Sequence, residues 1–389
     1  MLNLEKSRAV LRETGVSGWL LSNMFHRDEI ADLVLGVPRE KHNTRPWLCI
    51  LYADRPPVKI VHAIERAILD HVTGDTIRYS TRAELEAALG RALPGNGKLA
   101  ADYSRSIPVS SYLDHGTALL LEAAGATLVS AEDLVARYLG TLDDDGKRSH
   151  DSAAKVLYAA VADAWSRLGE ALRAGRALTE GDVQSWIAEA ISAAGLTTDG
   201  PLIVGAGRHT NDPHFEVAGR GAAFAPGDTV QFDIWAKERT PGAVYADISW
   251  VGVCAASPSE QQARLFETVR DAREAAVSLL QERLAAGRPV TGADADRAAR
   301  EVLISRGFAS AVKHRTGHSI GARVHGYGVN LDSVEFPDER RLTEGACFSI
   351  EPGLYLEELG MRTEIDCVVH QGGLHISGPG RQTRLLTLG

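Results

Sequence analysis

The sequence lacks a long apolar segment. No stretch of about 18 apolar residues, the length that a transmembrane helix requires, occurs in its 389 residues. The opening MLNLEKSRAVLRE reads as an amphipathic helix with both charge signs, unlike the apolar core of a signal peptide. Basic residues form no extended runs and the net charge is −9, so a surface attractive to nucleic acid or anionic lipid is not expected. We therefore expect a cytoplasmic protein without a nucleic-acid or membrane partner.

Cysteine is also scarce. The chain has four cysteines, Cys49, Cys254, Cys347 and Cys367, and no CxxC pair. Such scattered cysteines are typical of free thiols in a reducing compartment, and they do not fit a disulfide framework or a zinc knuckle.

Length and pattern predict two domains of α/β (α+β) class. A chain of 389 residues exceeds the usual size of a single core. In its first part, helical stretches (4–14 and 82–93) alternate with strand-like stretches (18–22, 47–52, 58–62 and 98–101), which predicts a mixed sheet flanked by helices. The polar segment 142–149 predicts a break. We expect an N-terminal domain over residues 1–145 and a second domain over residues 150–389, with a long helix over 153–173.

The second part contains an internal repeat. Residues 174–196 (AGRALTEGDVQSWIAEAISAAGL) align without a gap with residues 286–308 (AGRPVTGADADRAAREVLISRGF). Each copy reads as a turn, a Thr N-cap (Thr179 or Thr291), a helix and a closing glycine (Gly195 or Gly307). We predict two similar halves about a pseudo-twofold axis, with a site at their seam. The alternative is chance similarity between two Ala-rich helices, which the matching turns disfavour.

Five ionisable residues in this part stand in apolar or glycine-rich surroundings: Asp233, Asp247, His318, Glu351 and Glu364. An isolated buried carboxylate is strongly destabilising, so this set needs a neutralising partner. Two divalent cations about 3.5–4 Å apart would neutralise the carboxylates and hold a hydroxide between them. The alternative for any one of these acidic residues is an ordinary surface position.

Local sequence places the four carboxylates on two hairpins. Asp233 and Asp247 lie in the strand-like segments TVQFDIW and VYADISW, separated by a Pro-Gly turn. Glu351 and Glu364 lie in CFSIEPGLY and MRTEIDCVV, which again read as strand, turn and strand. Carboxylates on neighbouring strands can chelate a cation from two sides. His318 lies in TGHSIG, where glycines allow close backbone approach.

Together these motifs resemble the pita-bread metallopeptidases, which comprise methionine aminopeptidase, aminopeptidase P, prolidase and their non-peptidase relative creatinase. The resemblance rests on GMRTEID, SIEPGLY, DIW…YADIS, DPHF and HRTGHSIG with a second His seven residues on, and it spans residues 153–369. A two-domain chain is most similar to the aminopeptidase P and prolidase branch. This implies an N-terminal creatinase-like mixed-sheet domain and a C-terminal pita-bread domain.

The resemblance implies a role for each metal-ligand candidate. Asp233 would chelate one metal ion, His318 and Glu351 would bind the other, and Asp247 and Glu364 would bridge both. Two divalent ions per chain are therefore expected; Mn²⁺ is favoured and Co²⁺, Zn²⁺ or Fe²⁺ stay open, because oxygen-rich ligation with one imidazole suits all of them. A bound ion lowers the pKa of water to about 7 and polarises a carbonyl. Glu351 matches the family's general acid/base.

A substrate pocket is also implied. Four residues match family positions that line it: His214, His314, His325 and Arg362. By this resemblance His325 and His214 would donate hydrogen bonds to the developing oxyanion, and Arg362 would orient a carboxylate. A structural role is the alternative for each histidine. Two tyrosines, Tyr245 and Tyr355, are candidates for hydrogen bonds to this shell, with core packing as the alternative.

The chain departs from the family at two places. Family members that cleave beside proline commonly have Glu directly after the position of His325 and a proline two residues later, whereas this chain has Gly326, Tyr327 and Gly328. We therefore expect an altered specificity pocket. The interval from Asp233 to Asp247 is also a few residues longer than usual, which a longer hairpin tip would absorb.

The leading function is hydrolysis of short peptides by an Xaa-Pro aminopeptidase or dipeptidase. One alternative is a creatinase-like C–N hydrolase acting on a small non-peptide amide or amidine; another is a catalytically silent binding module of the same fold. A creatinase-like relative would not carry the complete metal set, so the five ligands favour a metallohydrolase. By resemblance, the N-terminal domain would cover the pocket mouth or build a homodimer, with residues 25–28 as a candidate contributor and a plain surface loop as the alternative.

Two further patterns point elsewhere. The segment from Gly317 to Gly321 fits the G-x-S-x-G nucleophile elbow around Ser319, with Asp366 and His370 as candidate partners, but the following ARVHGYGVNLD has no helical period. Gly205-Ala-Gly207 lacks the third glycine of a dinucleotide loop. Neither a serine hydrolase nor a nicotinamide enzyme is expected.

Overall fold

The computed structural model describes residues 2–95 and 97–388. The chain folds into two compact units, Met1–Leu139 and Gly140–Gly389, and each is described by itself. Helix α6 (Asp144–Arg173) begins nine residues before the predicted start at Ala153, so the prediction of a turn-rich break over residues 142–149 is wrong. The reason is local: the Asp143 side chain caps the helix by accepting a hydrogen bond from the Gly146 N–H at 2.8 Å, and acidic residues in the first turn suit the helix dipole.

The first unit is built on a mixed six-stranded sheet, as the alternating pattern predicts. The strand order is β4-β3-β2-β1-β5-β6, and β1 runs antiparallel to β2 and parallel to β5. The strands are β1 (Gly18–Asn23), β2 (Trp47–Tyr52), β3 (Val58–His62), β4 (Asp75–Tyr79), β5 (Lys98–Ala101) and β6 (Thr127–Ser130). The helices are α1 (Leu4–Thr14), α2 (Glu29–Leu35), α3 (Arg82–Ala92), α4 (His115–Ala123) and α5 (Glu132–Leu139), with short 3-10 turns η1 (Ala63–Glu65) and η2 (Pro108–Ser110).

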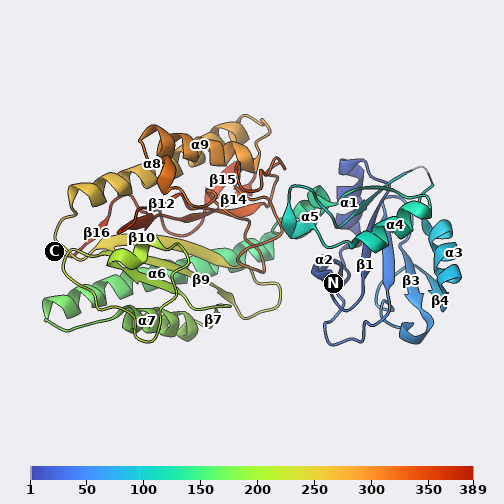
Figure 1. Ribbon diagram of the computed structural model, residues 1–389, viewed down its shortest axis with the longest axis horizontal. Helices are drawn as coiled ribbons and strands as arrows, with labels where there is room; N and C mark the ends of the chain where they lie inside the picture. The colour runs from blue at the N-terminus through green and yellow to red at the C-terminus, as the bar shows by residue number, and fades with distance from the viewer. Residues whose placement is uncertain (1, 96, 389) are drawn as a thin grey trace. The chain divides into compact units, whose positions relative to one another are not determined.

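The second unit carries the internal repeat as two helix pairs. Helices α6 and α7 (Glu180–Ala193) lie on one side of the central strands, and α8 (Glu260–Ala285) and α9 (Gly292–Ser305) lie on the other (Figure 1). Thr179 and Thr291 each form a capping box at the start of α7 and α9. Gly195 and Gly307 follow the two helices with positive φ angles of 79° and 89°. The aligned sequences therefore fold into equivalent elements, as predicted.

The strands of this unit form three small sheets between the helix pairs. One sheet has the order β16-β10-β9-β7 with β8 beside β9, the second has the order β11-β14-β15, and the third pairs β12 with β13. Their bounds are β7 (Leu196–Thr197), β8 (Ile203–Ala206), β9 (Thr229–Glu238), β10 (Ala246–Val253), β11 (Cys347–Ile350), β12 (Gly353–Tyr355), β13 (Gly360–Arg362), β14 (Ile365–His370), β15 (Gly373–Ile376) and β16 (Leu386–Thr387). Two 3-10 turns complete the unit, η3 (Gly207–Asn211) and η4 (Ala309–Ala311).

The apolar core fixes which way the carboxylates face. Phe232 and Ile234 on β9 pack with Leu157 and Val161 of α6 in one buried cluster. Because side chains alternate along a strand, Asp233 lies on the opposite face of β9, away from this core. None of the helices in the described ranges combines the length and apolar character that spanning a bilayer needs. The four cysteines are free and buried.

The two predicted carboxylate hairpins differ. Strands β9 and β10 pair as one continuous antiparallel hairpin. The second hairpin is interrupted: β11 pairs with β14 and β12 pairs with β13, and Glu351 and Glu364 occupy the two joints between these pairs. The prediction of a simple strand, turn and strand is therefore only partly right. The joint brings Glu364 against the first hairpin, because its N–H donates to the Ser249 carbonyl at 3.0 Å.

Gly317 packs closely against the backbone of Ser349. A Cβ atom on Gly317 would lie 2.0 Å from the Ser349 carbonyl oxygen, whereas a Cβ on Gly321, in the same segment, would meet nothing within 4 Å. We expect Gly317→Ala to destabilise the protein by about 1–3 kcal/mol, the usual effect of overpacking, and Gly321→Ala to change its stability by less than about 0.5 kcal/mol. Urea denaturation measures both. Equal stability of the two variants would contradict this close packing.

Candidate metal centre

The predicted site residues surround one cavity of the second unit. The cavity has a volume of about 690 Å³ and lies beside the joints of the interrupted hairpin. Every metal-ligand and pocket candidate predicted from the sequence lines it: Asp233, Asp247, His318, Glu351, Glu364, His214, His314, His325 and Arg362. Residues that lie up to 150 positions apart in sequence therefore meet at one place.

Strand register brings Asp233 and Asp247 to the same face of the first hairpin. Asp247 lies opposite Trp235, and Asp233 lies opposite Ser249. The two aspartates are therefore diagonal neighbours on one face, a relation that leaves both side chains within reach of a shared ligand. Ser249 is fully buried, and its Oγ donates to Asp233 Oδ1 at 2.8 Å.

Backbone hydrogen bonds fix two of the other candidates, Glu351 and His318. The Glu351 N–H donates to the Thr316 carbonyl at 2.7 Å, and the His318 N–H donates to Ser349 Oγ at 3.0 Å. Ser349 Oγ in turn donates to Glu351 Oε1 at 3.2 Å. One buried serine, Ser349, therefore holds both His318 and Glu351 in place.

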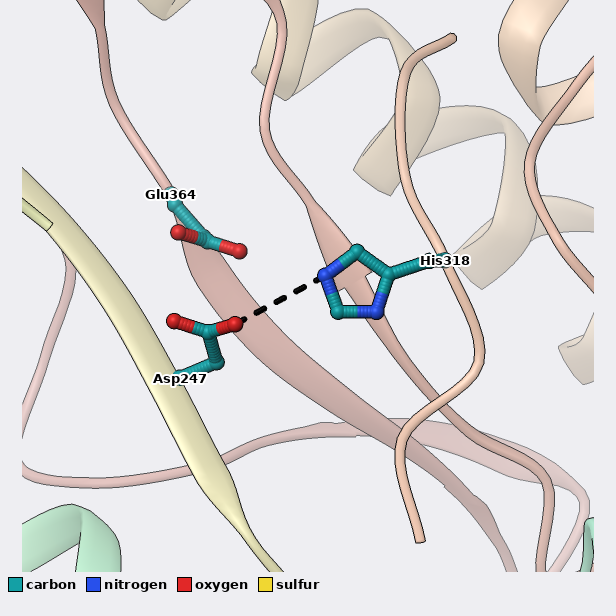
Figure 2. A group of neighbouring side chains, drawn as sticks. All are labelled: Asp247, His318 and Glu364. Atoms are coloured by element: carbon teal, nitrogen blue, oxygen red, sulfur yellow. Dashed lines mark ion pairs between the residues drawn. The ribbon is translucent and has the colours of Figure 1, made fainter. Parts of the chain in front are cut away.

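Asp247, His318 and Glu364 converge on one point (Figure 2). Each offers a ligand atom, and the three atoms lie within 4.8 Å of one another. His318 Nε2 lies 3.6 Å from Asp247 Oδ2 and 3.4 Å from Glu351 Oε1. Figure 2 shows the two carboxylates and the imidazole pointing toward each other from strand β10, the joint before β14 and a loop. Two carboxylates and an imidazole are a suitable donor set for a divalent transition metal.

Hydrogen bonding is incomplete at this point of convergence. Within residues 2–95 and 97–388, no donor reaches Asp247 Oδ1 or either carboxylate oxygen of Glu364, although both residues are buried. Buried polar atoms normally have partners, and an unpaired buried charge is strongly destabilising. A cation would satisfy all three oxygens, so these residues fit a divalent metal ion.

The Asp233 carboxylate, in contrast, has a partner for each of its oxygens. Ser249 donates to its Oδ1, and the Arg362 guanidinium pairs with its Oδ2. Arg362 also lies 3.8 Å from Glu351 Oε2 through its Nε. Both oxygens of Asp233 are therefore satisfied within the protein, with Arg362 supplying the positive charge on this side of the cavity.

The crowding changes the pKa values of the acidic groups. Burial, followed by repulsion from Asp247, Glu351 and Asp233, raises the pKa of Glu364 well above its ordinary value. Burial raises the pKa of Asp247 to about 7, although a hydrogen bond with His318 opposes the shift. Burial acts in the same direction on Glu351, but the charges of His318, His314 and Arg362 outweigh it and lower its pKa. The carboxylates are therefore not equivalent in the metal-free protein.

The imidazoles also differ. Burial alone would lower the pKa of His318, but its bond to Asp247 and the charge of Glu351 raise the pKa above its ordinary value. The His325 ring is exposed to the cavity and lies 4.2 Å from the His318 ring, edge to face. The charge of His318 is the main cause that lowers the pKa of His325 to about 3. His325 is therefore a neutral imidazole at physiological pH.

A hydrogen-bonded chain connects His314 to Arg362 through Tyr355. His314 Nε2 lies 2.8 Å from the Tyr355 hydroxyl, and Arg362 Nη1 donates to the same hydroxyl at 3.0 Å. Burial lowers the pKa of His314. His214 is exposed at the cavity wall, where its backbone N–H donates to Asp212 Oδ1 at 3.0 Å. Tyr355 thus contacts the predicted shell.

Other sequence candidates fall outside the centre. Tyr245 packs in an apolar cluster with Val244, Ile320, Cys347 and Val368. Residues 25–28 belong to the first unit, where Asp28 caps α2.

Ser319 is fully buried, and its Oγ accepts a hydrogen bond from the Gly328 N–H at 2.9 Å. Residues 320–331 follow an irregular, bent path rather than the helix of a nucleophile elbow. A Cβ on Gly326 would lie 2.9 Å from Ser319 Oγ. The unusual glycine after His325 is therefore part of the packing around Ser319.

Sequence reasoning missed the supporting roles of three residues. Ser249 and Ser349 hold Asp233 and Glu351 from buried strand positions, and Asp366 Oδ2 accepts a hydrogen bond from the Asp247 N–H at 2.7 Å. Each of the three lies two residues from a predicted ligand. Since side chains alternate along strands, a polar residue two positions away in an otherwise apolar strand is the signal that would have identified them.

Comparison with known proteins gives the family. Residues 148–371 match metallopeptidase family M24. The chain is 32% identical over 284 residues to the probable dipeptidase PepE of Mycobacterium tuberculosis, which covers 72% of this chain and 68% of that protein. It is 34% identical over 168 residues to the Xaa-Pro dipeptidase of Lactobacillus helveticus, covering 43% of this chain and 41% of the relative. The crystal structure of dipeptidase PepE from Mycobacterium ulcerans has a TM-score of 0.72 at 26% identity, covering 99% of this chain and 96% of that one.

The sequence motifs, the cavity and the relatives agree. The predicted pita-bread architecture is confirmed by the structural match, and the prediction of a metal-dependent peptidase is confirmed by the family match. This chain belongs to metallopeptidase family M24.

Proposed function

We propose that this protein hydrolyses short peptides with the help of two divalent metal ions per chain, and that Xaa-Pro bonds, in a dipeptide or at a free N-terminus, are its leading substrates. One observation carries the proposal: three buried carboxylate oxygens of Asp247 and Glu364 have no donor among the described residues and face His318 inside the cavity. A protein under no requirement to bind cations would gain stability by replacing such a cluster.

The ligand set comprises Asp233, Asp247, His318, Glu351 and Glu364. Their four carboxylates carry four negative charges, which two divalent ions would balance. When bound, such ions polarise a carbonyl and lower the pKa of water to about 7. Mn²⁺ is our first choice, and Co²⁺, Zn²⁺ or Fe²⁺ are compatible with the same oxygen and nitrogen donors.

The chain's own residues would position the peptide and move the proton. His325 is neutral and exposed to the cavity, so one ring nitrogen can donate a hydrogen bond to the oxygen of the scissile carbonyl as charge develops there. His214, on the cavity wall, would donate a second bond. Glu351 has a lowered pKa, so its carboxylate is available to accept a proton at neutral pH and pass it to the leaving amine.

The arginine network would keep these groups in place. Arg362 contacts Asp233, Ser249 and Tyr355 together. A planar guanidinium with several fixed donors orients its partners better than a flexible ammonium would. We therefore assign Arg362 a positioning role for the Asp233 carboxylate.

The substrate class is supported by the names of two relatives, a dipeptidase and an Xaa-Pro dipeptidase. Because the segment after His325 lacks the Glu and Pro common in proline-specific members, the substrates tested include peptides with and without proline. From the family resemblance we also propose a cytoplasmic homodimer.

Turnover of a small substrate panel tests the proposal. We expect the Mn²⁺-loaded protein to hydrolyse Ala-Pro or Gly-Pro, chelator to abolish this activity, and His325→Ala to lower kcat by about 10²–10³-fold, the usual effect of losing one oxyanion donor. The panel also includes Ala-Ala, Ala-Pro-Ala and creatine. Hydrolysis of creatine without any peptide hydrolysis would favour the creatinase-like alternative and refute the peptidase assignment.

Glu364→Gln separates metal binding from folding. In chelator, this variant should be at least as stable as the wild type at pH 8, because it removes a buried charge without a partner. In Mn²⁺ at 100-fold excess over Kd, the wild type should gain about 2.7 kcal/mol for each ion bound, and the variant should gain little. Calorimetric unfolding measures both effects. Glu282→Gln, at an exposed carboxylate paired with Arg288, is the matched control and should respond to Mn²⁺ as the wild type does.

The stability of the metal-free protein should depend on pH through the titration of Asp247. The folded chain retains a proton on Asp247 up to about pH 7, whereas the unfolded chain loses that proton near its usual pKa of about 4. The metal-free protein should therefore lose stability as pH rises from about 4 to 7, since the native state binds the extra proton. Asp28, whose pKa burial also raises to about 7, contributes in the same direction.

The urea midpoint of wild type minus that of Asp247→Asn, measured across this pH range in chelator, isolates the Asp247 contribution. A difference that does not change with pH would contradict the assigned pKa.

A further inference from the structure

Four basic side chains line the cavity around the candidate metal centre: Lys313, Arg315, Arg323 and Arg362. Three of them are committed to contacts within the protein. Arg362 pairs with Asp233, Lys313 Nζ donates to the Asn211 carbonyl at 3.0 Å, and Arg323 Nη1 donates to the Tyr327 hydroxyl at 2.9 Å.

Arg315 is different. Its side chain is half-buried in the cavity wall, and within the described part of the chain its guanidinium has neither a hydrogen-bond acceptor nor an ion-pair partner. The carboxylate of Glu335, also on the cavity wall, accepts a hydrogen bond from the Arg315 backbone N–H at 2.9 Å rather than from its side chain. A half-buried guanidinium loses part of its hydration, and because it has no acceptor within the described chain, its donors remain open to a ligand in the cavity.

The position of Arg315 places this charge beside the reacting groups. It stands between His314 and His318 in sequence, and all three line the cavity. His325 lines the same cavity, and its ring lies 4.2 Å from the His318 ring. A ligand group that paired with Arg315 would therefore lie close to a peptide carbonyl held by His325.

Building on the proposed peptidase function, we propose that Arg315 binds a carboxylate of the substrate and makes the site selective for short anionic peptides. The planar fork of guanidinium donors matches the two oxygens of a carboxylate and can form two parallel hydrogen bonds with it. The carboxylate has two sources, the free C-terminus of a dipeptide or the side chain of a Glu or Asp residue beside the scissile bond. Both present the same chemistry to Arg315.

Kinetics with matched substrates distinguish these sources. Ala-Pro and Ala-Pro amide differ only in the C-terminal charge, and Ala-Glu amide and Ala-Gln amide differ only in a side-chain charge. Arg315→Gln should raise KM about ten- to hundredfold for whichever anionic member is preferred, the range expected for one charge-assisted hydrogen-bonded pair. It should change kcat by less than about threefold, since the interaction is made equally in the ground and transition states. Its effect on the neutral members should be small.

Arg315→Lys keeps the charge and loses the fork, so it should fall between the wild type and Arg315→Gln. Arg288→Gln is the matched control, because Arg288 pairs with Glu282 on the surface and is outside the cavity lining. It should leave the preference unchanged.

Calorimetric binding provides a readout that does not depend on turnover. The ligand is the reduced-amide analogue of Ala-Pro, in which a methylene replaces the scissile carbonyl, compared with its C-terminal amide; the Ala-Glu and Ala-Gln amides are compared in the same reduced form. We expect the wild type to bind one anionic ligand at least about tenfold more tightly than its neutral partner, the size of one such pair, and Arg315→Gln to lose that preference.

Equal binding of both members of each pair by the wild type, or a preference that survives in Arg315→Gln, would overturn the assignment of Arg315. If the wild type hydrolyses no peptide yet shows the charge preference in binding, the proposed function fails and the Arg315 assignment stands.

Discussion

Three carboxylate oxygens of Asp247 and Glu364 are buried beside each other with no donor in the described chain. The surrounding strands hold both side chains in this position. Burial, reinforced by the crowding of like charge, raises the pKa of Glu364 and of Asp247, which means that folding without a cation works against desolvation and electrostatic repulsion. The fold must supply enough apolar burial elsewhere to hold the group together. Hydrophobic layers on α6 and β9 provide that support on one side of the hairpin.

Duplication explains how one chain brings so many acidic groups to one point. Each half contributes a helix pair and a carboxylate-bearing hairpin, and the hairpins meet where the Glu364 N–H donates to the Ser249 carbonyl. Each hairpin also carries a buried serine, Ser249 or Ser349, that holds a carboxylate. The centre depends on the seam between the halves, so neither half alone contains the complete ligand set.

Much of this arrangement is readable from the sequence because it is local. Alternating apolar residues around Asp233 and Asp247 predict the strands, and the Pro-Gly turn predicts the hairpin. The N-caps at Thr179 and Thr291 follow from short-range hydrogen bonding, and both are present in the structure. The family resemblance adds the order of the candidate ligands, and all of them line the cavity.

What could not be predicted depends on contacts between distant segments. The interruption of the second hairpin at Glu351 and Glu364 follows from its packing against β10, which no local pattern encodes. The reason for a glycine after His325 becomes clear only in the folded chain, where a Cβ on Gly326 would lie 2.9 Å from Ser319 Oγ. Arg362 is paired, whereas the Arg315 side chain has no partner among residues 2–95 and 97–388; this difference depends on which carboxylates the folded chain brings near each arginine.

Anomalous diffraction from crystals grown with Mn²⁺ tests the central claim most directly, because it locates the ions without reference to activity. Two peaks about 3.5–4 Å apart, with Asp247 and Glu364 contacting both and His318 contacting one, are the expected result. Absence of manganese from this cavity at saturating concentration, or ions bound only at surface carboxylates, would contradict a binuclear centre.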